Sequence, residues 1–177
     1  MTEAPSGLRA PDFIVTQDGW ITWRGGRARC ALGRAGVVLQ ADKREGDGAT
    51  PGGIFPLKSV LYRPDRGESP QTALACRALM PDDGWCEDPT DPSYNCMVKL
   101  PSGATADRLW RDDHLYDVIV VIGHNDDPVR PGMGSAIFLH LARPDYSPTA
   151  GCVAVSREDM KRILAAAEPS SRLIIRG

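Results

Sequence analysis

The chain has 177 residues, a length that fits one folded domain over residues 1–177 and can bury a core of its own. Hydrophobic residues make up 42% and charged residues 25% of the chain, which is ordinary for a globular protein in water. The net charge of −2 provides no strongly positive surface, so neither nucleic acid nor an anionic membrane is an expected partner.

The sequence shows neither a membrane span nor a secretory signal. No window approaches the roughly 18 apolar residues that cross a bilayer. Residues 1–10 have neither a basic start nor an apolar stretch. We therefore expect a cytoplasmic protein, or a periplasmic one if a leader has been removed from the sequence.

Turn residues recur along the whole chain. The 18 Gly and 15 Pro are spread widely, which favours many short strands over a helical bundle. The first two strands, residues 13–16 and 19–23, are predicted to form a hairpin. Further strands are expected at residues 28–32, 36–39, 54–62 and, with a less regular pattern, 72–79.

Three segments in the first two thirds of the chain lack a regular pattern. Residues 43–53 are dense in Gly and are expected to form a loop, and residues 84–99 are predicted to form a long irregular loop. Loops of that length usually have a function. Residues 109–115 fit either a short helix or a loop.

The C-terminal third has the clearest regular elements. Asp117-Val-Ile-Val-Val-Ile-Gly123 is an unbroken β-branched run, typical of a buried strand. Ser156-Arg-Glu-Asp159 is a capping box, which predicts a helix that continues through Ala167 and ends before Pro169. Residues 171–175 are expected to form the last strand.

A histidine and a cysteine stand at the ends of two expected strands. His140 lies near the end of the strand over 136–141, and Cys152 begins the strand over 152–155 after a Pro-rich loop. A thiol reacts as thiolate, and an imidazole is its usual base. Gly151 lets the backbone pass close to a substrate carbonyl. The pattern favours a cysteine acyl-transfer enzyme, although buried cysteines and core histidines are also common in proteins without such chemistry.

The cysteines do not indicate disulfides or a metal site. Their number, five, is odd, and no C-x-x-C spacing occurs, so a disulfide framework is not expected. The conceivable zinc ligands lack the close pairs of structural sites, and the H-x-E motif of zinc deaminases is missing. We therefore expect neither a metal nor another cofactor. Those conceivable ligands are Cys86, Cys96, His114 and His124.

Three blocks of the sequence resemble the L,D-transpeptidase catalytic-domain family (YkuD-like). Thr149-Ala-Gly-Cys152 resembles the family's Ser/Thr-x-Gly-Cys element, and His140 stands at the position of the family's base. Residues 43–55 resemble its Thr-Pro-x-Gly-x-Phe block, and residues 122–140 resemble a subgroup of single-domain members. The resemblance implies a mostly β fold, a β-sandwich of mixed sheets with long loops and a short C-terminal helix.

Two positions depart from the family pattern. The family usually has Arg or Asn two residues after the cysteine, where this chain has Ala154. Many members have His before the Gly, where this chain has Ala150. Both changes affect how a substrate is bound, because Arg or Asn would be a natural partner for a carboxylate or carbonyl group.

The resemblance also implies a substrate and a reaction. The family's substrate is the stem peptide of peptidoglycan, or a muropeptide, attacked on the carboxyl side of meso-diaminopimelate. Cys152 would attack that carbonyl and expel D-alanine, while His140 would remove the thiol proton and then protonate the leaving amine. Backbone N–H groups around Gly151 and Cys152 are the expected oxyanion hole. A backbone carbonyl is expected to orient the histidine.

The acceptor of the acyl group distinguishes two enzyme activities. Water gives an L,D-carboxypeptidase, and an amine gives an L,D-transpeptidase. The expected cytoplasmic location favours the carboxypeptidase, acting on recycled tetrapeptides, with the transpeptidase as the alternative. A papain-like peptidase is disfavoured because its cysteine precedes its histidine, and a non-catalytic peptidoglycan-binding module would not need a Gly-Cys nucleophile element.

Basic, aromatic and polar residues near these blocks are candidates for substrate binding. The basic ones could bind substrate carboxylates in place of the missing arginine, although a solvated surface charge is the commoner role. The aromatic ones could form a cleft wall, although aromatic residues in loops pack on the core just as often. The sequence does not indicate an oligomeric state. The candidates are Lys43, Trp85, Tyr94, His124, Asn125, Arg130, Arg143 and Thr149.

Overall fold

The computed structural model describes residues 12–177. Residues 1–10, in which no secretory signal was expected, lie outside the described residues. The strands are β1 (Asp12–Thr16), β2 (Trp20–Trp23), β3 (Gly26–Ala31), β4 (Val37–Leu39), β5 (Thr50–Tyr62), β6 (Cys76–Ala78), β7 (Asp83–Cys86), β8 (Met97–Lys99), β9 (Ala106–Arg108), β10 (Val118–Ile122), β11 (Phe138–Leu141), β12 (Val153–Val155) and β13 (Arg172–Arg176). The helices are a 3-10 turn, η1 (Gln40–Asp42), and α1 (Arg157–Ala166).

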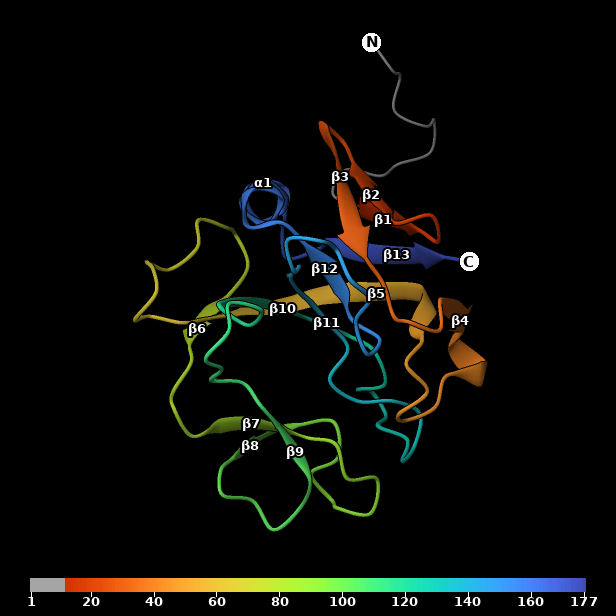
Figure 1. Ribbon diagram of the computed structural model, residues 1–177, viewed down its shortest axis with the longest axis vertical. Coiled ribbons are helices and arrows are strands. Elements are labelled where there is room, and N and C mark those ends of the chain that lie inside the picture. Colours follow the sequence, from red (N-terminus) through yellow and green to blue (C-terminus); the bar gives the residue numbers. More distant parts are fainter. Residues whose placement is uncertain (1–11) are drawn as a thin grey trace.

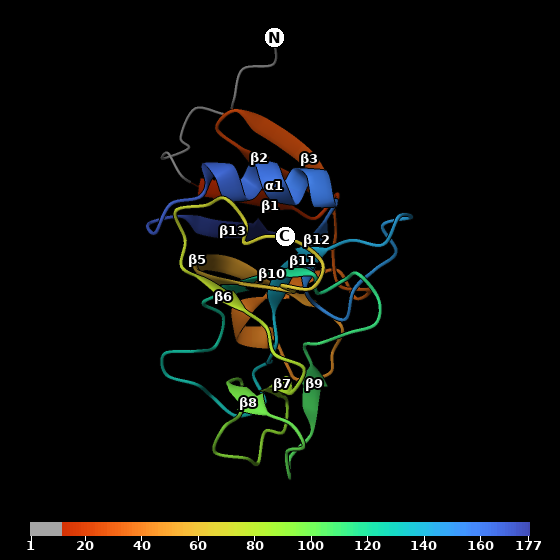
Figure 2. The ribbon, with the colours of Figure 1, turned by 90° about the vertical axis from the view of Figure 1, so that its left-hand side faces the viewer.

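Eight strands close into a mixed barrel. Their order is β10-β11-β12-β3-β2-β1-β13-β5, and β5 pairs back with β10. The β1–β13 and β11–β12 pairs are parallel, and the other neighbours in the ring are antiparallel. β7, β8 and β9 form a separate small sheet below the barrel (Figures 1 and 2). The expected mostly β class with mixed sheets and a short C-terminal helix is confirmed, and the long β5 joins the sheets into one closed ring.

The alternation of side chains along the barrel strands creates two cores. Residues on one face of each strand fill the barrel, together with the buried face of α1. Residues on the other face of β10 and β11, such as Ile119 and Phe138, pack outside the barrel against the small sheet. The alternation therefore gives the same strands two buried faces. The second core also contains Leu61, Leu79, Leu109, Tyr116, Ala136 and Cys152.

The structure corrects two predictions. Residues 43–53 are not all loop, because β5 begins at Thr50 and residues 50–52 pair with β4. Residues 84–99 are not one irregular loop, because β7 and β8 lie there and pair with each other. Asp83, buried in β7, forms ion pairs with Lys99 and Arg77, so polar contacts hold these strands where the sequence shows no apolar alternation.

The C-terminal helix forms as predicted. The Ser156 hydroxyl accepts a hydrogen bond from the Asp159 N–H, and α1 ends at Ala166, before Pro169. The predicted strand over residues 117–123 is β10. Residues 109–115, for which two interpretations were open, form no helix. Within residues 12–177, no helix has the length and apolar character needed to cross a bilayer.

Candidate active site

The register of β11 and β12 brings His140 and Cys152 to one face of the barrel wall. The two strands are parallel, with His140 opposite Ala154 and Leu139 opposite Val153. Leu139 and Val153 point into the barrel core, so His140 and Phe138 point outward. Cys152, one residue before β12, packs with Phe138 in the outer core. The nucleophile and base candidates thus share the outward face of the barrel wall.

The Cys152 thiol is fixed by two backbone contacts. The Phe138 N–H donates to Sγ at 3.3 Å, and the S–H donates to the Ala136 carbonyl at 3.2 Å. The side chain lies in the second core, with the residue 7% exposed. Burial raises the thiol pKa to about 12, and the charges of Asp107 and Glu87 act in the same direction. At neutral pH the resting cysteine is therefore a thiol and not a thiolate.

His140 is oriented by a backbone carbonyl, as expected. Its Nδ1 lies 2.9 Å from the Leu141 carbonyl, which can only accept, so Nδ1 carries the proton and Nε2 is free to act as a base. The Tyr116 ring packs against the imidazole, with 5.2 Å between the ring centroids. Burial lowers the His140 pKa to about 4, and the charges of Arg111 and Arg143 add to this effect. The imidazole is therefore neutral at pH 7.

Gly151 and Thr149 shape the turn that presents the cysteine. Gly151 has φ of +146°, and a Cβ there would lie 2.9 Å from the Ala49 carbonyl oxygen, so only glycine fits. The Thr149 hydroxyl accepts from the Gly151 N–H at 3.1 Å and donates to the Cys152 carbonyl at 2.6 Å. The Gly151 N–H is thus bonded at rest and the Thr149 hydroxyl holds the turn, while the expected contact of Thr149 with a substrate stays a prediction.

Strand β7 and the segment between β7 and β8 contribute polar side chains near the thiol. The Trp85 indole N–H donates to the Asn95 side-chain oxygen at 2.9 Å, and its ring packs edge-on against Phe138 with 5.0 Å between centroids. The Tyr94 hydroxyl bonds to the Glu45 carboxylate and accepts from the Gly134 N–H. Trp85 thus lies beside the cysteine's neighbour Phe138, whereas Tyr94 is buried and fastens two loops together.

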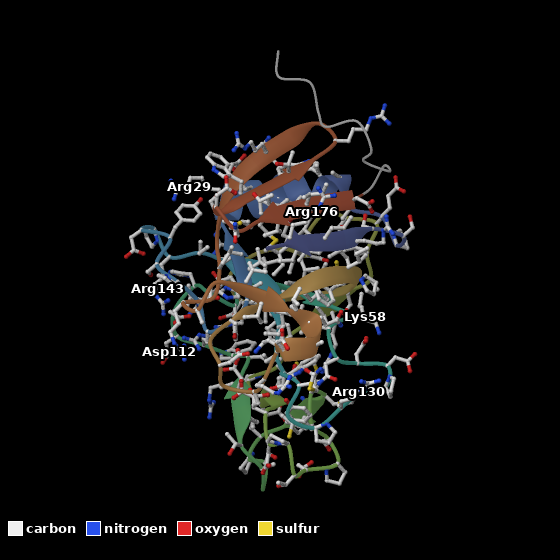
Figure 3. All side chains as sticks on the ribbon, turned by 90° about the vertical axis from the view of Figure 1, so that its right-hand side faces the viewer. Arg29, Lys58, Asp112, Arg130, Arg143 and Arg176 are labelled. Atoms are coloured by element: carbon white, nitrogen blue, oxygen red, sulfur yellow. The ribbon has the colours of Figure 1, made fainter. Side chains whose placement is uncertain are left out.

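The three candidate cations occupy different places. Lys43 is buried, and its ammonium group bonds to the Asp47 carboxylate at 2.6 Å and to the Arg44 carbonyl. Its charge still reaches Cys152 and lowers the thiol pKa against the stronger effect of burial. Arg130 and Arg143 are exposed and lie at opposite edges of the view in Figure 3. The structure therefore does not gather the three cations around the cysteine.

His124 and Asn125 organise the loop that leads to β11. The His124 ring is buried, its Nε2 lies 3.1 Å from the Met133 carbonyl, and its Nδ1 has no partner among residues 12–177. Burial lowers the His124 pKa. The Asn125 amide bonds to the backbone of Arg130 and Gly134. A cavity of about 300 Å³ lies beside His124, lined also by Trp85 and Phe138.

Sequence reasoning did not single out several groups that shape the site. The Tyr116 hydroxyl donates to Asp107 at 2.7 Å while its ring contacts His140. Glu87 lies close to Asp107, and burial together with that neighbouring charge raises the Glu87 pKa to about 7. These residues come from the small sheet and its loops, and no motif marks them. The one available signal, the density of polar residues in the long segment 84–99, includes Glu87 but neither Asp107 nor Tyr116.

Ala154 occupies the position where the family pattern has Arg or Asn. It is 1% exposed and lies in β12 between Ala31 of β3 and His140 of β11. A longer side chain would have to displace these neighbours, since packed interiors tolerate added volume poorly. The small residue is therefore part of the packing around the histidine.

Comparison with known proteins identifies the family. The YkuD profile, described as the L,D-transpeptidase catalytic domain, matches residues 11–175. No curated protein gives a match. Among solved structures, the helical cell shape determining protein Pgp2 from Campylobacter jejuni aligns with a TM-score of 0.37 and 14% identity, over 93% of this chain and 46% of that one. This chain thus spans about half the length of Pgp2. Because the profile covers nearly all of the chain, the protein belongs to the L,D-transpeptidase catalytic domain (YkuD) family.

Proposed function

We propose that this protein is a cysteine acyltransferase that acts on peptidoglycan stem peptides, with Cys152 as nucleophile and His140 as general base. The observation that carries the proposal is the parallel register of β11 and β12, which sets a carbonyl-oriented neutral imidazole and a thiol on the same outward face. Membership in the family supports the peptide substrate. The expected removal of D-alanine after meso-diaminopimelate follows from the same likeness.

The resting protonation states determine how the nucleophile is activated. Burial keeps the Cys152 thiol protonated and His140 neutral, so no thiolate–imidazolium pair is present before substrate binds. The thiol proton therefore moves from Sγ to Nε2 of His140 as Sγ bonds to the substrate carbonyl carbon. The Gly151 N–H is bonded to Thr149, which leaves the Cys152 N–H as the candidate donor to the oxyanion.

The second half of the reaction returns the same proton. The C–N bond breaks, His140 gives its proton to the departing D-alanine amine, and a thioester to Cys152 remains. His140 then removes a proton from the acceptor, and the acceptor displaces the thiolate, which regains its proton. In each half of the reaction His140 takes up one proton and releases one. Its Nε2 can do this because only Nδ1 is bonded to the Leu141 carbonyl.

We propose water as the acceptor, which makes the enzyme an L,D-carboxypeptidase. A transpeptidase must also bind a second peptide, and Ala154 stands where a carboxylate or carbonyl partner would be expected. Lys43 is paired with Asp47, and the other two candidate cations are dispersed on the surface. Water needs no such partners. L,D-transpeptidation remains the second candidate, and action on recycled fragments in the cytoplasm remains a prediction of the sequence.

The test is incubation with disaccharide tetrapeptide, with and without a D-amino acid as amine acceptor, followed by mass spectrometry. Loss of alanine alone supports the carboxypeptidase, whereas exchanged residues or dimers support the transpeptidase. Cys152→Ala is the inactive control, and Cys76→Ala is the matched control because Cys76 is exposed on β6. If neither product forms with the wild-type protein, the proposed substrate is wrong.

A further inference from the structure

We propose that Asn95, in the loop between β7 and β8, is a positioning residue for the Cys152 thiol and acts through the backbone of Ala136. The proposal rests on the proposed function in one respect only, that Cys152 is the nucleophile. A residue between two strands of the small sheet would thus position the reacting thiol of the barrel.

The Asn95 side chain is buried, and every hydrogen-bonding position of its amide has a partner. Its oxygen accepts from the Trp85 indole N–H at 2.9 Å and from the Ala136 N–H at 3.1 Å. Its nitrogen donates to the carbonyls of His124 at 3.0 Å and Asn125 at 2.7 Å. A buried amide with four partners fixes the segments that it joins, because breaking any one bond leaves an unpaired polar group.

Ala136 connects this amide to the thiol. Its N–H is bonded to Asn95, and its carbonyl accepts the S–H of Cys152 at 3.2 Å. Its φ of +52° is in the left-handed region, which a residue with a side chain adopts less readily than the ordinary helical region. A conformation that is unfavourable by itself persists only if its neighbours impose it. The bond to Asn95 is the contact that holds the Ala136 N–H.

Asn95 is itself firmly placed. Its φ of +57° is one that asparagine tolerates better than most residues. Its N–H donates to the Cys86 carbonyl at 2.9 Å, and the Cys86 N–H donates to the Cys96 carbonyl at 2.9 Å, so the loop is closed at the ends of β7 and β8. The ends of β7 and β8 therefore hold Asn95, the Asn95 amide holds Ala136, and the Ala136 carbonyl holds Sγ of Cys152.

The contact has a chemical consequence for the thiol. The S–H bond to Ala136 stabilises the protonated form and sets the direction of Sγ, while the Phe138 N–H holds the other side of the sulfur. Without the Asn95 bond, Ala136 can relax toward an ordinary backbone conformation, and its carbonyl turns away from the sulfur. We expect a thiol that ionises more easily but is no longer aimed at the substrate carbonyl.

The test uses Asn95→Gly, which keeps a left-handed backbone accessible and removes only the amide. Iodoacetamide labelling of Cys152 is followed by mass spectrometry across pH, without substrate. The charged and titratable groups near Cys152 include Asp107, Glu87, Lys43, Tyr116 and the proposed base His140, and all remain in the variant. We expect the labelling midpoint to fall by about one pH unit because the thiol form loses its acceptor.

Turnover is expected to become slower, although labelling of Cys152 becomes faster. The kcat should fall by about tenfold to a hundredfold because the sulfur is misdirected, while KM changes little. Thr90→Ala is the matched control, since Thr90 lies in the same loop and bonds only to Asp88.

Buried Cys30, on β3, reports unfolding in the same experiment. Faster labelling of Cys152 with Cys30 still protected supports the proposal. An unchanged midpoint and kcat in a folded Asn95→Gly protein overturns it. Cys30 and Cys152 becoming reactive together also overturns it, because the amide would then be merely structural. The labelling result does not depend on which peptide is the substrate.

Discussion

The barrel and the small sheet contribute to the site in different ways. The barrel strands β11 and β12 have apolar buried faces, and their register sets the positions of Cys152 and His140. The small sheet is held by ion pairs around buried Asp83, and its Trp85 and Met97 pack against the core that contains Cys152. It also contributes the carboxylates and amides that surround the thiol, among them Asp107 and Asn95. The reacting groups thus belong to the barrel, and their environment belongs largely to the small sheet.

This difference suggests how the two parts respond to mutation. A change to a reacting group on the barrel should remove the chemistry and leave the fold intact. A change to the small sheet should alter the reactivity of Cys152 or loosen the cover while the barrel persists, because the barrel's closed ring does not include β7, β8 or β9.

The largest effect is expected for Cys152→Ala on the barrel. Turnover should be lost, because Cys152 is the only cysteine of the second core within residues 12–177, and no other thiol there can replace it. Released D-alanine and the thermal unfolding midpoint are the measurements. Substitution of Cys30, Cys76, Cys86 or Cys96 should leave most of the activity. If Cys152→Ala kept a rate near that of the wild type, Cys152 would not be the nucleophile.

His140→Ala tests the other barrel residue. Loss of a general base should lower kcat by about 10²–10⁴-fold. Alkylation of Cys152 at neutral pH should also slow, since the imidazole no longer accepts the thiol proton. The fold should persist because His140 makes its side-chain hydrogen bond only to Leu141 within residues 12–177. If alkylation were unchanged, His140 would not activate the thiol, and His124 would be the next candidate for the base.

The stability of the barrel should depend on pH through the same histidine. The His140 pKa is about 4 in the folded protein against 6.5 for an ordinary histidine. Between these values the unfolded chain takes up a proton that the folded chain does not, so stability is fully present above pH 6.5 and falls as pH falls to 4. The decrease is roughly 3 kcal/mol in the free energy of unfolding.

Urea unfolding at pH 7 and at pH 4.5 measures this change. His140→Gln should show a smaller decrease with acid, while His114→Gln, which removes an exposed histidine that contacts Asp117, leaves His140 in place and should keep most of the decrease. His124, whose pKa is also lowered, contributes in the same direction and remains in both variants. An equal decrease in wild type and His140→Gln would contradict the assignment.

A mutation in the small sheet sharpens the contrast. Asp83→Ala removes a buried carboxylate that accepts from the Met80 N–H and pairs with Lys99 and Arg77. Leaving that N–H unpaired should cost about 1–3 kcal/mol. In hydrogen exchange, the amides of β7–β9 should lose protection before those of β11 and β12. Lys99→Ala should have a smaller effect, since Arg77 and the Met80 N–H still bond to the Asp83 carboxylate.

The smallest effect is expected at the exposed arginines. Arg143→Ala should raise KM by about two- to tenfold with little change in kcat, because a surface cation that binds a substrate carboxylate contributes to ground state and transition state alike. Its charge reaches His140, which places it nearer the site than Arg130. Steady-state kinetics of both alanine variants make the comparison. If neither KM changes, the cover formed by the small sheet is the better account of binding.

Local sequence patterns were sufficient for part of the fold. The unbroken apolar run of β10 and the capping box of α1 predicted their elements, because propensity and burial there act in the same direction. The same patterns missed the start of β5 at Thr50, where Pro51 and two glycines oppose a strand and pairing with β4 and β13 decides the outcome.

By itself, the sequence determined that the chain is mostly β and that Cys152 and His140 are the candidate reacting pair, since motif, order and turn residues are local information. Only the tertiary structure decided what surrounds them. The pKa directions of both groups arise from burial by segments outside the two strands, with Trp85 packed against the core of Cys152 and Tyr116 packed on His140. The contact from Asn95 to Ala136 joins residues 41 positions apart. The burial of Cys152 and His140 and the Asn95–Ala136 contact depend on segments distant in the chain, so the local sequence around Cys152 or His140 does not predict them.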